Sequence, residues 1–292
     1  MTAPAAAGSD AALTALVNGA AAAGISALDR GLHFGDGVFE TIACLHGRPR
    51  FLTLHLERLA HGCRTLGFPP PAGELLRAEI ERLAGAQERA IVKLIVTRGP
   101  AIVRGYAVSG REQATRVAIR YPWPVEDPNL QQGVSVRVAA VPLGENPALA
   151  GLKHCNRLEQ ILARNEPGAA ATAEALMLSR SGKLVSGTMT NVFLVDGPAQ
   201  APRLRTPAID LCGVAGVMRR VVLREAARAG IAAAECALSP ADLAAATEIF
   251  LTNARVGVWP VSRLEERTLT PGPLTRRIQS LLRPLLEEPA DG

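Results

Sequence analysis

The sequence predicts a mixed α/β (α+β) protein of two domains. The chain has 292 residues, stretches of helical and strand periodicity alternate along it, and prolines interrupt it near the middle. A chain of this length exceeds the usual size of a single hydrophobic core. Hydrophobic residues make up 48% and charged residues 20% of the chain, which is the balance of a globular protein.

The first part of the chain predicts a sheet covered by helices. Asn18-Gly19 separates two short apolar segments and suits a tight hairpin turn. Apolar residues recur at helical spacing over 51–66 and again over 75–83. We expect strands in RAIVKLIVTRG and TRVAIRYPWP, which are β-branched runs that end at Gly or Pro.

A linker is predicted where Pro122, Pro124 and Pro128 precede the new strand GVSVRVAAVPL. We therefore expect an N-terminal α/β domain over residues 1–121, a linker over 122–132 and a C-terminal domain over 133–292.

The second part predicts alternating helices and strands. We expect a helix in HCNRLEQILARNEP, adjacent strands in EALMLS and LVSGTMTNVFLVDG, a strand in EIFLTNARVGVWPV and a last helix over 274–286. The tail EEPADG is expected to be mobile. CGVAGVMRRVVLREAARAG places two glycines ahead of a long amphipathic helix, an arrangement in which free backbone N–H groups face an anion.

Charge and cysteine content exclude several classes of protein. The formal net charge is +5, but basic and acidic residues alternate, and aromatic residues make up only 3%. Both features argue against nucleic-acid binding. The five cysteines form no CxxC pair, so we predict no metal site and no disulfide framework. We expect a cytoplasmic protein, because the sequence shows neither a basic leader nor a long apolar run.

Lysine chemistry has few candidates, because lysine occurs only at Lys93, Lys153 and Lys183. A lone lysine is more often a surface residue than a catalytic one, and a glycine pair before a helix is more often a turn than a phosphate site. From the residues alone, the prediction is a two-domain protein that binds a phosphorylated small molecule.

Four stretches together resemble the class-IV aminotransferase-like family of pyridoxal-phosphate enzymes. They are DRGLHFGDGVFET, HLERL, GLKHCNRLEQILAR and TPAIDLCGVAGVMRR. The run NRLEQ after Lys153 is most similar to the aminodeoxychorismate lyase branch. The resemblance implies the fold-type-IV architecture, with a smaller N-terminal α/β domain and a larger C-terminal domain built on a mixed, barrel-like sheet. It also implies a homodimer.

The resemblance assigns roles to individual residues. Lys153 would bind pyridoxal 5'-phosphate covalently and act as the catalytic base, and Arg58 would clamp the cofactor phosphate. Further cofactor contacts would come from Ser186, from the backbone of Val217 and Met218, and from Asn253 and Ala254. Arg104 and Tyr106 would bind the substrate carboxylate, commonly from the partner subunit. A free lysine, with a pKa of about 10.4, is protonated at neutral pH, so the site must desolvate Lys153 or place positive charge near it.

One position departs from the family pattern. Relatives carry Glu at the position of Ser186, where the carboxylate pairs with the pyridine nitrogen of the cofactor. A hydroxyl stabilises a protonated ring nitrogen less well, which favours an elimination over transamination.

The expected activity is therefore a lyase reaction that releases 4-aminobenzoate and pyruvate for folate synthesis. An aminotransferase acting on D-amino or branched-chain amino acids is the alternative on the same fold. A relative that has lost catalysis and only binds a ligand is a second alternative.

Overall fold

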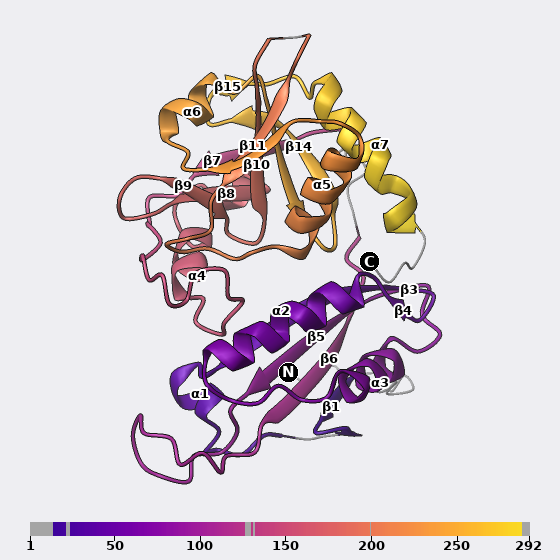
Figure 1. The fold of residues 1–292 in the computed structure, drawn as a ribbon, viewed down its shortest axis with the longest axis vertical. Helices are drawn as coiled ribbons and strands as arrows, with labels where there is room; N and C mark the ends of the chain where they lie inside the picture. The colour runs from indigo at the N-terminus through magenta and orange to yellow at the C-terminus, as the bar shows by residue number, and fades with distance from the viewer. Residues whose placement is uncertain (1–13, 22–23, 126–129, 131, 199, 288–292) are drawn as a thin grey trace, which may run out of the picture.

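The computed structural model describes residues 14–21, 24–125, 130, 132–198 and 200–287. Figure 1 shows two lobes, each built on one sheet. The N-terminal lobe contains a six-stranded antiparallel sheet in the order β2-β1-β6-β5-β3-β4. The C-terminal lobe contains a nine-stranded mixed sheet in the order β12-β11-β10-β13-β14-β7-β8-β9, with β15 beside β14. The predicted mixed α/β fold class is confirmed.

The N-terminal sheet packs its apolar side against two helices. Alternate residues of β5, including Val92, Leu94 and Val96, are buried in a core shared with α2 and α3. Asn18 and Gly19 have φ values of 50° and 82°, which confirms the predicted hairpin turn between β1 and β2. The elements are β1 Ala15–Val17, β2 Ala20–Ala21, α1 Arg30–Phe34, β3 Gly37–Leu45, β4 Arg48–Pro49, α2 Leu52–Thr65, α3 Gly73–Ala84, β5 Arg89–Thr97 and β6 Thr115–Pro122.

The C-terminal sheet has a core on each face. Phe193 and Phe250, stacked with ring centroids 4.8 Å apart, pack with α5 and α7 in one core. Trp259 and Leu243 lie in the other. The elements are β7 Val134–Val138, α4 Leu158–Arg164, the 3-10 helix Ala169–Ala171, β8 Glu174–Leu178, β9 Leu184–Gly187, β10 Asn191–Asp196, β11 Arg203–Pro207, α5 Val217–Arg228, β12 Ala233–Cys236, α6 Pro240–Ala245, β13 Glu248–Asn253, β14 Gly257–Leu264, β15 Arg267–Thr268 and α7 Pro273–Glu287.

Two stretches that were each predicted as one continuous strand form two strands in the structure. The run over 184–196 divides into β9 and β10, because the buried carboxylate of Glu174 accepts hydrogen bonds from the backbone N–H groups of Thr188 (3.0 Å) and Met189 (3.1 Å). The run over 248–261 divides into β13 and β14, because the Asn253 side chain accepts from two backbone N–H groups of the intervening turn. In both places a side chain accepts hydrogen bonds from backbone N–H groups of the turn, although the N–H of Thr188 also donates to Ala175 O (3.1 Å).

The region of the predicted linker separates the two sheets. Strand β6 ends at Pro122 and β7 begins at Val134. Residues 126–129 and 131 of the linker, the leader and the tail beyond Glu287 lie outside the described residues, and the exact domain boundaries remain a prediction. Within the described ranges, no helix is long and apolar enough to cross a membrane.

Candidate active site

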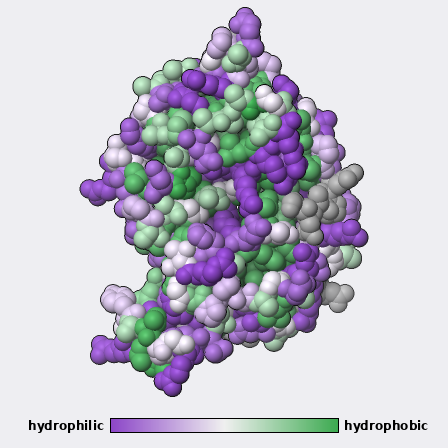
Figure 2. Space-filling model, viewed as in Figure 1, coloured by the Kyte–Doolittle hydropathy of each residue, from purple (hydrophilic) through white to green (hydrophobic). Residues whose placement is uncertain are grey.

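Residues from both lobes line a cavity of about 530 Å³. Figure 1 shows α2 between the N-terminal sheet and the C-terminal lobe, and Figure 2 shows hydrophilic residues gathered where the lobes meet. The N-terminal lobe contributes Phe39, Thr41, Arg58 and Ile91. The C-terminal lobe contributes, among others, Lys153, Arg157, Ser186, Val217, Asn253 and Ala254. The structure therefore brings together most of the predicted cofactor residues.

The backbone of Lys153 is attached to the edge of the N-terminal sheet. The N–H of Phe39 donates to the carbonyl oxygen of Lys153 (2.9 Å), and the N–H of Cys155 donates to that of Gly37 (2.9 Å). Because residues 153–155 pair with β3 in this way, helix α4 begins only at Leu158 and not at His154, where the sequence predicted it.

The same segment is attached to the glycine-containing loop of the C-terminal lobe. Gly151 donates its N–H to Gly213 O (3.0 Å) and accepts from Ala215 N at its own oxygen (3.1 Å). The Arg157 guanidinium donates to the carbonyl oxygens on both sides of the lysine, those of Leu152 (3.1 Å) and His154 (2.9 Å). Both lobes thus fix the position of Lys153.

The Lys153 side chain has the environment that lysine chemistry requires. Its Nζ lies 4.5 Å from the centroid of the Phe39 ring. Burial, together with the nearby charge of Arg58, lowers the pKa of Lys153 to about 7. A large share of the amine is then unprotonated at neutral pH and can act as a nucleophile or a base.

Arg58 is held between the two lobes. Its Nε and Nη2 donate to the two carboxylate oxygens of Glu40 at 2.8 and 2.5 Å, and its Nη1 donates to Ala215 O at 2.9 Å. The remaining N–H groups on Nη1 and Nη2 are available to an anion in the cavity.

Helix α5 presents its N-terminus to the cavity. Among the described residues, no side chain caps this helix at Gly216, so the N–H groups of its first turn, including those of Val217 and Met218, are available. A side chain at Gly216 would collide with Asn191, whose Oδ1 lies 1.9 Å from the place of a Cβ. The Met218 side chain is buried in the core, so only its backbone can reach a ligand.

Ser186, Asn253 and Ala254 line the cavity, and their contact with a cofactor remains a prediction. The Ser186 hydroxyl donates to Gly187 O (2.8 Å), which leaves its oxygen lone pairs free to accept. The Asn253 side chain shapes the turn after β13, accepting from Arg255 N and Val256 N at 3.0 Å each. Asn253 therefore shapes the wall of the cavity at this turn.

Arg104 and Tyr106 are not brought to this cavity within one chain. They lie on the loop between β5 and β6, where Tyr106 is 84% exposed. The buried Arg30 anchors this loop by donating to the carbonyl oxygens of Gly105, Tyr106 and Ala107. Apolar residues are exposed here and gather at the lower left of Figure 2, near α1. The predicted role of this loop at the partner's site remains a prediction.

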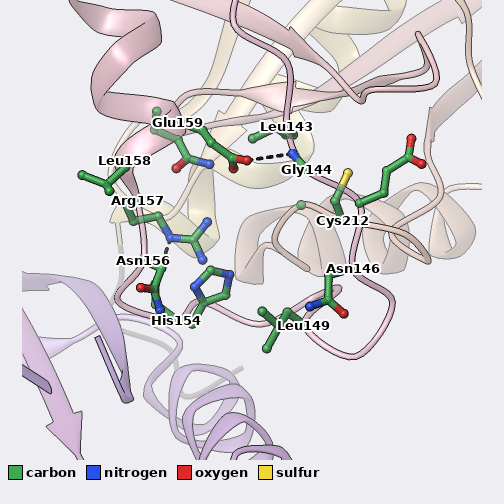
Figure 3. Close-up of a pocket in the computed structure, with 13 residues that line it drawn as sticks. Leu143, Gly144, Asn146, Leu149, His154, Asn156, Arg157, Leu158, Glu159 and Cys212 are labelled. Atoms are coloured by element: carbon green, nitrogen blue, oxygen red, sulfur yellow. Dashed lines mark hydrogen bonds between the residues drawn. The ribbon is translucent and has the colours of Figure 1, made fainter. Parts of the chain in front are cut away.

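A second cavity of about 370 Å³ adjoins the first and shares Arg157, Gln160 and Gly213 with it. Figure 3 shows Arg157 and His154 on one side of this cavity and Cys212 on the other. Within the part of the chain that the structure describes, no group of His, Cys, Asp and Glu side chains could hold a metal ion.

Sequence reasoning gave no role to Glu40, His55 or Asn191. Glu40 lies in the first family-like stretch and His55 in the second, three residues before Arg58. These positions were the sequence feature that could have pointed to a role at the site. The partners of Glu40 and His55 depend on how α2 packs on β3, and that of Asn191, Val214 O, depends on how β10 meets the loop before α5. The sequence specifies neither contact.

The site residues fit a phosphorylated aldehyde. Lys153 offers an unprotonated amine for the carbonyl group, while Arg58 and the uncapped start of α5 offer N–H donors for the phosphate.

Comparison with known proteins agrees with this chemistry. The model of the Amino-transferase class IV family matches residues 37–264. The chain belongs to this family. It is 34% identical over 271 residues to an aminodeoxychorismate lyase of Vibrio harveyi, covering 91% of this chain and 98% of that protein. It is 28% identical over 261 residues to a D-alanine aminotransferase of Bacillus licheniformis, covering 87% and 89%.

Among solved structures, the chain is similar to 4-amino-4-deoxychorismate lyase from Pseudomonas aeruginosa. The TM-score is 0.87 and the sequence identity is 43%, covering 94% of this chain and 100% of the other. This similarity confirms the fold-type-IV architecture expected from the sequence.

Proposed function

We propose that this protein is a pyridoxal-phosphate-dependent 4-amino-4-deoxychorismate lyase that releases 4-aminobenzoate and pyruvate. The observation that carries the proposal is Lys153, fixed by both lobes, with a pKa lowered to about 7 beside Arg58. Two similar proteins described above carry the lyase name, at 34% and 43% identity. One cavity combines a buried amine, which can bind the aldehyde of the cofactor, with N–H donors, which can bind its phosphate.

Seven residues would hold the cofactor. Lys153 would bind it covalently, and Arg58 with the N–H groups of Val217 and Met218 would bind its phosphate. Asn253 and Ala254 would add contacts from the turn after β13. Ser186 Oγ, whose own proton is donated to Gly187 O, would accept from the ring nitrogen. Pyridoxal phosphate, when bound, supplies an electron sink for the substrate carbon next to the amine.

Lys153 would carry the proton transfers. In its unprotonated form, Nζ takes the proton from the substrate carbon that bears the amine. The neighbouring carbon–oxygen bond then breaks and the ring becomes aromatic. The enolpyruvyl group leaves with the bonding electron pair and becomes pyruvate when its methylene carbon takes up a proton, which balances the proton held by Lys153. Phe39 and Ile91 lend apolar surface to the cavity, which limits the access of water to the amine.

The alternative is an aminotransferase for D-amino or branched-chain amino acids on the same scaffold. Ser186 favours the lyase, since a hydroxyl supports a protonated ring nitrogen less than a carboxylate does. The variant Ser186→Glu is expected to raise transaminase turnover relative to lyase turnover. An unchanged ratio would remove this argument.

We also propose a cytoplasmic homodimer. Exposed apolar residues on the loop of Arg104 and Tyr106, including Ile102 and Val103, support a contact with a second copy. In that arrangement the loop would bring Arg104 and Tyr106 to the substrate carboxylate at the partner's cavity.

The test of the proposed function is direct. The purified protein, freed of cofactor, is incubated with aminodeoxychorismate and no keto acid, with and without added pyridoxal phosphate. Pyruvate and 4-aminobenzoate should appear in equal amounts only with the cofactor. Production of neither, together with transfer of an amino group from D-alanine or leucine to 2-oxoglutarate, would establish the aminotransferase instead.

A further inference from the structure

Glu40 is a fully buried carboxylate that the proposed reaction does not use. It lies on β3, and its exposed fraction is 0%. Both of its oxygens are engaged by side chains of α2. Oε1 accepts from Arg58 Nε at 2.8 Å, and Oε2 accepts from Arg58 Nη2 at 2.5 Å and lies 2.6 Å from His55 Nδ1.

A buried pair of this kind is a costly way to pack a helix on a sheet. Removing charged groups from water offsets much of their attraction, and apolar residues of similar size often stabilise a protein as well or better. The pair also lies at the cavity and not in a remote part of the core, because Arg58 lines the cavity beside Lys153. A role at the cavity therefore explains it better than packing.

The contacts of Glu40 determine which side of Arg58 faces a ligand. A guanidinium is planar, so two parallel bonds from Nε and Nη2 fix its plane. The third bond, from Nη1 to Ala215 O, fixes the end next to the loop that precedes α5. The N–H groups left on Nη1 and Nη2 are thereby held beside the N-terminus of that helix. Without Glu40, the side chain would lose the bonds that fix its plane.

Glu40 also balances charge. Arg58, Arg157 and Lys93 all disfavour a proton on Lys153, and Glu40 is the charged group that opposes them. Although burial favours the protonated carboxyl, the charge of Arg58 and the bonds from α2 hold the pKa of Glu40 at about 2. The carboxylate is therefore ionised at every pH at which the protein would work.

His55 holds Glu40 without adding a charge. An ionised carboxylate only accepts hydrogen bonds, so Nδ1 of His55 must carry the proton and donate it. Burial lowers the pKa of His55, which keeps the ring neutral at pH 7.

We propose that Glu40, held by His55, is a positioning residue that orients Arg58 for the phosphate of the cofactor and supplies the counter-charge of the cavity. The inference rests on the proposed use of pyridoxal phosphate. It assigns no contact between Glu40 and the substrate.

The chain contains a matched control. Glu79 on α3 is 5% exposed and accepts from Nε (3.0 Å) and Nη2 (2.8 Å) of Arg116 on β6. This pair has the same chemistry and also joins a helix to the N-terminal sheet, but neither residue lines the cavity. A purely structural role predicts the same effects for Glu40→Gln and Glu79→Gln.

The first measurement is ligand discrimination by the full-length protein freed of cofactor. Dissociation constants are measured for pyridoxal phosphate and for pyridoxal, which lacks the phosphate. In Glu40→Gln the preference for the phosphorylated form should fall about tenfold or more, the value of a charge-assisted hydrogen bond. In Glu79→Gln it should not change.

The second measurement is the titration of Lys153 in the same cofactor-free protein. The chain has only three lysines, so labelling lysine with ¹³C at Cε gives few signals, and Lys153→Arg assigns the one of interest. Glu40→Gln should move the midpoint of Lys153 down by about 1 pH unit, because an opposing charge is lost. The midpoint in Glu79→Gln should match the wild type.

Glu40→Asp separates the two parts of the proposal and serves if Glu40→Gln does not fold. The shorter side chain keeps the charge but withdraws it from Arg58, so phosphate preference should fall while the Lys153 midpoint stays within about 0.3 pH units. Wild-type preference and midpoint in the Glu40 variants, or equal losses in Glu79→Gln, would overturn the inference. Failure of the wild type to bind pyridoxal phosphate would instead contradict the proposed function.

Discussion

Lys153 and His154 are neighbours in the chain, yet they line different cavities. Lys153 lines the larger cavity with Arg58 and the start of α5, whereas His154 lines the smaller one with Glu159 and Cys212. Burial lowers the pKa of both, to about 7 for Lys153 and about 4 for His154.

The difference between them lies in what surrounds each base. Around Lys153 the structure gathers an oriented guanidinium, free helix N–H groups and a counter-charge at Glu40. Beside His154 the guanidinium is that of Arg157. Its Nε donates to the backbone oxygen of His154 and not to the His154 ring. A perturbed base alone does not make a catalytic site, and the donors for a phosphate are what separate the two cavities.

The largest effect is expected from removing the amine. Lys153→Ala should lower lyase turnover by about 10³-fold or more, because it removes both the covalent attachment and the base. Turnover is measured as pyruvate release at saturating pyridoxal phosphate. Retention of more than a tenth of the wild-type rate would show that another residue carries the proton.

The next effect is expected from removing the phosphate donor. Arg58→Ala should weaken the binding of pyridoxal phosphate by about 10- to 100-fold, since charge-assisted hydrogen bonds are lost. Equilibrium titration of cofactor-free protein measures it. Arg116→Ala, which breaks the equivalent pair away from the cavity, should leave this affinity unchanged.

Lys153 and His154 should make the stability of the cofactor-free protein depend on pH in two different pH ranges. The folded pKa of Lys153, about 7, is below the ordinary value of 10.5, so between these pH values the unfolded chain holds a proton that the folded chain lacks. Stability therefore rises with pH across this window by at most about 5 kcal/mol, since one pKa unit corresponds to about 1.4 kcal/mol. Lys153→Met should remove this rise in denaturant unfolding measured at pH 7 to 10.

His154 acts in a lower window with the same sign. Its folded pKa, about 4, lies below the ordinary 6.5, so stability is lost as the pH falls from 6.5 to 4. His154→Ala should reduce the loss in that window and leave the rise above pH 7 intact. If both variants changed the same window, the two residues would not be independent.

The smallest effect is expected on catalysis at the second cavity. His154→Ala should change kcat by less than about threefold, which corresponds to about 0.7 kcal/mol. A loss comparable to that of Lys153→Ala would mean that the smaller cavity also takes part in the reaction.

The sequence predicted the local features of this site better than its tertiary contacts. Lys153, Arg58 and the glycines before α5 stand in family-like stretches, so their meeting in one cavity could be expected. The pairing of residues 153–155 with β3 could not, because it depends on contacts between distant parts of the chain. The same holds for Glu174, whose bonds to residues 188–190 interrupt a run that has strand periodicity.

The residue at which the cofactor is attached tests the role of Lys153 most directly. The protein is incubated with pyridoxal phosphate, reduced with borohydride, digested and mapped by mass spectrometry, with Lys93 and Lys183 as internal controls. We expect a single modified peptide that contains Lys153, and no cofactor retained by Lys153→Ala. Attachment at Lys93 or Lys183, or an unmodified chain, would contradict this expectation.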